Sequence, residues 1–181
     1  MPRLIERLLI VAASLAIAIG VIALLSGGLL AGRDNPGVSG GADGPGLAFA
    51  DQGDAHLRLG ELQPVYDSNP PTSGAHVDEP VTTDGAALND YQLLTALEVG
   101  DVVLMYGTRT PPAGLQSDLA GIAPPFTPAL AATGQAIILA RRDGVSGVIG
   151  LAWAHLLPSS SPAGPALRDF AQFWLGRGAR G

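Results

Sequence analysis

The chain has 181 residues, which is enough for one domain of ordinary size together with an anchor or a tail. It contains no cysteine and no lysine, which excludes disulfides, thiolate chemistry, lysine Schiff bases and a P-loop lysine. The formal net charge is -6, and residues 51–101 carry many acidic side chains but only Arg58 as a cation. This acidic half should repel nucleic acid and favour a cation or a basic partner.

The N-terminal segment is dominated by an apolar run. Residues 8–31 hold no charged side chain, and a helix of about 24 residues would extend about 36 Å, enough to cross a bilayer. The run is longer than the roughly 7 to 15 residues of a signal-peptide core, although Arg3 and Arg7 precede it. The sequence therefore predicts an uncleaved signal anchor over residues 1–32, with a single membrane span and the C-terminal domain outside the cytoplasm.

Small residues recur at intervals of four inside this segment, at Ala12, Ala16 and Gly20. Such a stripe lets a second transmembrane helix approach closely. A plain lipid-facing anchor is the alternative, because alanine is common in membrane helices.

The composition changes after the apolar run. Residues 33–46 are rich in Gly, Pro, Asp and Ser, and such a segment cannot bury enough apolar surface to fold alone. We expect it to be a flexible tether. Residues 47–178 should then form an extracytoplasmic globular domain, and residues 179–181 a short tail.

The first part of the domain contains one clear helix and one clear strand. Residues 64–66 ("PVY") predict a brief strand. Residues 89–100 ("NDYQLLTALEVG") predict a helix that is capped by Asn89, carries an apolar stripe and stops at Gly100. The helix leads directly into a strand over residues 101–107 ("DVVLMYG").

The second part contains weaker helices and a strand pair. Residues 113–120 and 165–175 predict helices, the second with Leu167, Phe170 and either Phe173 or Trp174 on one face. Residues 136–156 predict two strands that form a hairpin around an Arg-Arg-Asp-Gly turn. The expected fold class is α+β: a small, mostly antiparallel sheet of three to five strands with two or three helices, preceded by one N-terminal transmembrane helix.

A rigid polar loop, "YDSNPPTSGAH", covers residues 66–76. Its prolines fix φ, its glycine permits a tight reversal, and its hydroxyls can bond to neighbouring backbone groups. The loop would hold His76 in a defined place, which suits a binding site but equally suits a structural corner. The residues expected to shape the loop are Tyr66, Asn69, Pro70, Pro71, Thr72, Ser73 and Gly74.

Several segments together resemble one family. "GDAHLRLGELQPVYDSNPPTSGAH", "TALEVGDVVLMY", "LAWAHL" and "LRDFAQFWLGRG" are similar to a bacterial exported or membrane-anchored domain of unknown function, family number 3105. The family pattern has a Tyr-x-x-x-Pro-Pro-Thr-Ser-Gly-Pro-His loop and a His-x-Leu-Glu-His-Gly element. This chain has Ala75 in place of the loop proline, and Thr95 and Val99 in place of the two helix histidines. The resemblance therefore implies a degenerate member.

A histidine pair four residues apart, joined by two loop histidines, would suit copper or zinc. In this chain His56 and His76 remain, and Asp54 or Glu98 could complete a set of two histidines and one carboxylate. The alternative is structural: Glu98 pairs with the rigid loop, and His76 donates to a backbone carbonyl. His155 lies in an apolar segment and is expected to be a core or edge histidine.

No nucleophile elbow and no glycine-rich nucleotide loop occur in the sequence, so we expect no enzyme and no cofactor. The favoured function is a non-catalytic accessory or interaction subunit of a membrane complex, with membrane subunits or a basic soluble protein as partners. The alternative is an extracytoplasmic domain that binds or delivers copper or zinc.

Overall fold

The computed structural model describes residues 38–39, 44–58, 60–162 and 164–179. The chain separates into two compact units, Met1–Val38 and Ser39–Gly181, and the description below concerns the second. Among the described residues, no helix has the length and apolar character needed to cross a membrane. The predicted anchor over residues 1–32, including its stripe of Ala12, Ala16 and Gly20, lies outside the described residues.

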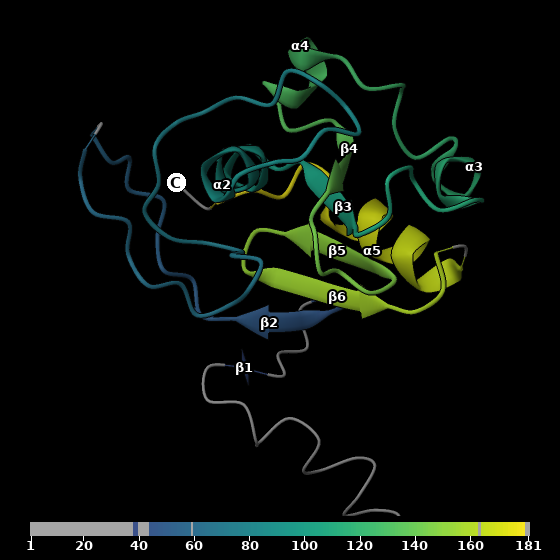
Figure 1. Ribbon diagram of the computed structural model, residues 1–181, viewed down its shortest axis with the longest axis horizontal. Coiled ribbons are helices and arrows are strands. Elements are labelled where there is room, and N and C mark those ends of the chain that lie inside the picture. The colour runs from purple at the N-terminus through teal and green to yellow at the C-terminus, as the bar shows by residue number, and fades with distance from the viewer. Residues whose placement is uncertain (1–37, 40–43, 59, 163, 180–181) are drawn as a thin grey trace, which may run out of the picture. The chain divides into compact units, whose positions relative to one another are not determined.

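The second unit is built on a sheet in which the strands follow the order β2-β6-β5-β3-β4 (Figure 1). Three of its four pairings are antiparallel, and β3 pairs with β4 in parallel. The expected α+β class with a mostly antiparallel sheet is therefore confirmed. The strands are β2 (Leu47–Phe49), β3 (Val102–Tyr106), β4 (Ile137–Arg141), β5 (Val148–Ala152) and β6 (His155–Ser159), and a two-residue strand β1 (Val38–Ser39) precedes them.

The helix predicted over residues 89–100 is confirmed as α2 (Asp90–Val99). The Asn89 side chain accepts from the Gln92 backbone N–H, and the Gln92 side chain accepts from the Asn89 N–H, which forms a capping box. Gly100 ends the helix with a φ of 111°, a conformation that glycine adopts without strain. Leu93, Leu94 and Leu97, which form the predicted apolar stripe, are fully buried.

Helices cover both faces of the sheet, and the side chains of the interior strand β3 alternate between the two cores. Val103 and Met105 of β3 face the core that contains α2, whereas Leu104 and Tyr106 face the core that contains α3 and α5. Figure 1 shows α2 and α5 on opposite sides of the strands. The remaining helices are α3 (Leu115–Leu119), α4 (Pro128–Ala131) and α5 (Pro165–Trp174), of which α4 was not expected from the sequence.

Two local predictions are wrong. Strands β4 and β5 do not form a hairpin, because β3 lies between them and pairs with both. The hairpin is instead β5–β6, joined at Trp153 and Ala154. Residues 64–66 form no strand, because Val65 is 92% exposed and this segment has no neighbouring strand to pair with in the described sheet.

Candidate metal centre

Residues 53–57 and residues 74–76, which both precede α2 in the sequence, form a short parallel ladder. Gly74 N–H donates to the Gly53 carbonyl at 2.9 Å, and His76 N–H donates to the Ala55 carbonyl at 3.0 Å. Leu57 N–H then donates to the His76 carbonyl at 2.7 Å. These bonds place His56 directly beside His76.

The rigid loop over residues 66–76 is also held by hydrogen bonds to residues outside this ladder. Ser73 Oγ donates to the Ala50 carbonyl at 3.2 Å and accepts from Gln52 N–H at 3.1 Å. The Thr72 carbonyl accepts from Ala154 N–H at 2.9 Å. Gly74 has a φ of 121°, and a side chain there would meet the Tyr66 ring at 2.9 Å, so only glycine fits. The loop is therefore a buried corner whose backbone is paired on both sides.

His76 is fully buried, with a side-chain exposure of 0%. Its Nδ1 lies 2.9 Å from the Gly74 carbonyl oxygen, which can only accept, so Nδ1 carries a proton. In the neutral ring, Nε2 is then unprotonated and carries a lone pair. This atom lies 3.1 Å from Glu98 Oε2 but is not aligned for a hydrogen bond, and it has no other partner among the described residues.

His56 contacts the same carboxylate oxygen. Its Nε2 lies 2.9 Å from Glu98 Oε2, and its ring meets the His76 ring edge to face, with centroids 5.4 Å apart. Glu98 lies in the last turn of α2, where its backbone carbonyl accepts from Ala179 N–H at 2.9 Å. The ligand atoms of His56, His76 and Glu98 all lie within 4.8 Å of one another. Two imidazoles and one carboxylate therefore point to one place.

The charges around His56 favour its protonated form. The hydrogen bond to Glu98 raises the pKa of His56, burial opposes this, and the charges of Glu98, Asp78 and Asp54 raise the pKa further. The same arrangement would attract a metal ion, because a metal cation beside the Glu98 carboxylate would balance its negative charge, as the proton on His56 does. A metal ion at this place has to displace that proton.

The structure brings together three of the four predicted ligands. Asp54 is exposed and does not join the cluster, and its charge is only a minor contribution to the pKa of His56. Tyr66 also stays outside, and its hydroxyl donates to the Ala75 carbonyl at 2.9 Å. His155 is a half-buried edge histidine whose ring stacks on Trp174, with centroids 3.8 Å apart. Both structural roles considered for the loop, a backbone bond from His76 and a contact with Glu98, are present at the site.

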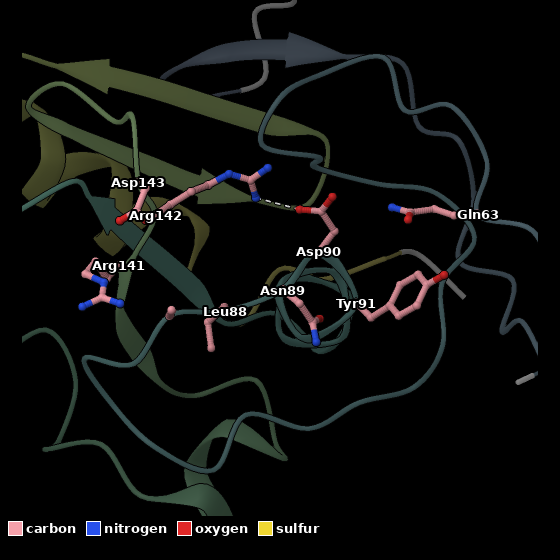
Figure 2. A pocket seen from close by; sticks show the side chains of 9 residues that line it. Gln63, Leu88, Asn89, Asp90, Tyr91, Arg141, Arg142 and Asp143 are labelled. Carbon is pink, nitrogen blue, oxygen red and sulfur yellow. Dashed lines mark hydrogen bonds and ion pairs between the residues drawn. The ribbon is translucent and has the colours of Figure 1, made fainter.

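A separate cavity of about 540 Å³ opens at the start of α2 (Figure 2). Arg142 extends across it, donating to Asp90 Oδ1 at 2.6 Å and to Asn69 Oδ1 at 3.0 Å. Arg142 therefore links the start of α2 to the rigid loop over residues 66–76. Sequence reasoning did not identify this role, because nothing in the Arg-Arg-Asp-Gly stretch indicates a partner distant in sequence. The three clustered residues do not line this cavity.

The fold and the cluster define a small α+β domain with a candidate metal centre. The chain belongs to a family described as protein of unknown function (DUF3105), whose sequence pattern matches residues 62–179. His76 and Glu98 lie inside the matched range, and His56 lies just before it. No curated protein and no solved structure matches the chain.

Proposed function

We propose that this domain binds one divalent transition-metal ion through His56 Nε2, His76 Nε2 and Glu98 Oε2. One observation carries the proposal: the buried Nε2 of His76 faces a carboxylate oxygen at 3.1 Å while its other nitrogen donates to a carbonyl. A lone pair and a carboxylate oxygen repel each other in a buried site. A cation between them removes the repulsion, and His56 supplies a further ligand beside it.

The type of ligand limits the choice of ion. Imidazole nitrogens suit zinc and copper, and two histidines with one carboxylate form a recognised zinc ligand set. The chain has no cysteine, so the soft thiolate ligands that favour monovalent copper are absent. Zinc and divalent copper are therefore the ions proposed.

A purely structural imidazolium–carboxylate cluster is the competing explanation. A proton on either histidine would also neutralise the Glu98 carboxylate, so the contacts alone agree with a metal site and with a structural ion pair. The favoured function from sequence, a membrane-complex accessory subunit, stays a prediction, as do the membrane anchor, the extracytoplasmic location and the absence of catalysis. The cluster favours metal binding over a general accessory role, because an interaction surface does not require two histidines converging on one carboxylate oxygen.

The test measures the binding of zinc and of copper to the full-length chain in mild detergent by isothermal titration calorimetry. We expect one equivalent of ion, and loss of binding in His76→Ala. His155→Ala is the matched control, because His155 is the remaining histidine of the chain and lies outside the cluster. Equal binding by wild type and His76→Ala, or no binding by the wild type, would contradict the proposal.

A further inference from the structure

The three proposed ligands are held in very different ways. His76 is fully buried, its ring is fixed by the bond to the Gly74 carbonyl, and both its backbone groups are paired in the ladder. Glu98 has a side-chain exposure of 21% and belongs to a capped helix. His56 has a side-chain exposure of 51%, and among the described residues its ring hydrogen-bonds to Glu98 alone. Removing the ion's bond to His56 would therefore disturb little else.

The coordination number leaves room for an external ligand. Three protein ligands occupy three positions of a tetrahedral ion, and sites of this kind keep the fourth position open. Because His76 is enclosed and His56 is half exposed, solvent reaches the site from the His56 side. The charges of Asp78 and Asp54 act on His56 and would also raise the local concentration of cations.

One of the described cavities lies close to the three residues. His56, His76 and Glu98 line none of the cavities described, but one of about 470 Å³ is lined by Asp78 and by Thr95 and Val99 of α2. The half-exposed His56 side chain leaves the ion open to an incoming donor, which suits ligand exchange.

We infer that the site transfers its ion by associative exchange, with His56 as the releasable ligand and His76 and Glu98 as the holding pair. The acceptor is a molecule that presents nitrogen, oxygen or sulfur donors to the half-exposed His56 side of the site. Its lone pair would bond to the ion at the open position, the bond from the ion to His56 Nε2 would break, and that lone pair would return to the ring. Further donors of the acceptor would then replace Glu98 Oε2 and His76 Nε2 in the same way, so that the ion leaves the site. No electron is transferred, and the ion keeps its charge. This inference rests on the proposed function.

The experiment follows zinc release from the loaded full-length chain into 4-(2-pyridylazo)resorcinol, a chromogenic nitrogen and oxygen donor, by stopped flow. We expect the release rate to rise in proportion to the chelator concentration. His56→Ala should still take up zinc, with an affinity on the order of 10- to 100-fold lower, and should release it faster. His76→Ala should retain none, and His155→Ala should match the wild type.

Two results overturn the inference and leave the proposed function intact. One is a release rate that does not depend on chelator concentration, and the other is complete loss of zinc in His56→Ala. If the wild type takes up no zinc, both the inference and the proposed function are wrong. Should His76→Ala not fold, as judged by circular dichroism, Glu98→Gln serves as the variant of the holding pair, and retention of zinc at wild-type affinity by Glu98→Gln also overturns the inference.

Discussion

Nε2 of His76 lies 3.1 Å from Oε2 of Glu98, at the end of a buried loop and the last turn of a helix. Contacts distant in sequence hold the segments that carry both residues. The loop is held by strand β2's continuation at Ala50 and Gln52, and the helix end is held by the C-terminal residues. The pair is thus a product of the tertiary fold, and it is the part of the site least able to move.

The Glu98→Gln variant separates metal binding from folding. The amide removes the negative charge but can donate to the His76 lone pair, so we expect the metal-free domain to remain folded. Zinc affinity should fall on the order of 100-fold, because an amide oxygen is a poor substitute for a carboxylate ligand. Calorimetric titration measures the affinity. Glu61→Gln is the control, because Glu61 is exposed and its side chain accepts from the nearby Arg58 N–H.

Bound zinc should stabilise the folded domain. A ligand that binds only the native state at about 100 times its dissociation constant adds about 2.7 kcal/mol to the free energy of unfolding. We expect the melting temperature to rise with zinc and to return to its metal-free value with a chelator. A melting temperature unaffected by zinc in the wild type, measured by circular dichroism, would speak against the site.

Asp101 should make stability depend on pH. Burial raises the pKa of Asp101 from 3.8 to about 7, and a hydrogen bond from the Ala136 N–H opposes this. The folded state therefore keeps a proton that the unfolded state releases above about pH 4. The stabilisation is fully present below the ordinary pKa, and it is lost as the pH rises toward 7, by about 1.4 kcal/mol for each unit of pKa difference.

Urea unfolding at several pH values checks this effect. Asp101→Asn keeps an acceptor for the Ala136 N–H but cannot ionise, so its free energy of unfolding should decline less between about pH 4 and pH 7. Identical pH profiles for the two proteins would show that Asp101 is ionised in the folded domain.

Ala154 has a φ of 56°, in the left-handed region that alanine disfavours. Its N–H donates to the Thr72 carbonyl and its carbonyl accepts from Phe49 N–H, so the hairpin tip cannot relax. We expect Ala154→Gly to raise the free energy of unfolding by up to about 1 kcal/mol. Ala152→Gly, in the buried part of β5, should instead lower it. Thermal unfolding distinguishes the two, and a loss of stability in Ala154→Gly equal to that in Ala152→Gly would contradict this account.

Gly178 supports Glu98 from the C-terminal side. A Cβ at Gly178 would lie 1.9 Å from the Glu98 carbonyl oxygen, so Gly178→Ala must displace the tail or the end of α2. We expect a loss of about 1 to 3 kcal/mol in the free energy of unfolding and weaker zinc binding. In Gly164→Ala, the new Cβ meets its nearest neighbour at 3.5 Å, so this control should leave zinc affinity unchanged. Wild-type zinc affinity in Gly178→Ala would mean that the tail does not position Glu98.

Local signals in the sequence were sufficient for α2 and for part of the site. Asn89 and Gly100 are strong cap residues, and the histidine and carboxylate types made His56, His76 and Glu98 candidate ligands, which the structure brings together. Strand pairing was harder to predict from the sequence, because the position of β3 between β4 and β5 depends on contacts distant in sequence. Asp54 and Glu98 were equivalent as sequence candidates, and only the position of the last turn of α2 distinguishes them.

The most direct measurement of the central claim is zinc-edge anomalous diffraction from crystals of the zinc-soaked chain. We predict one anomalous peak at about 2.0 to 2.2 Å from His56 Nε2, His76 Nε2 and Glu98 Oε2. A crystal that shows these three side chains in direct mutual contact, with the zinc peaks elsewhere or missing, would contradict the account and leave the cluster as a structural ion pair.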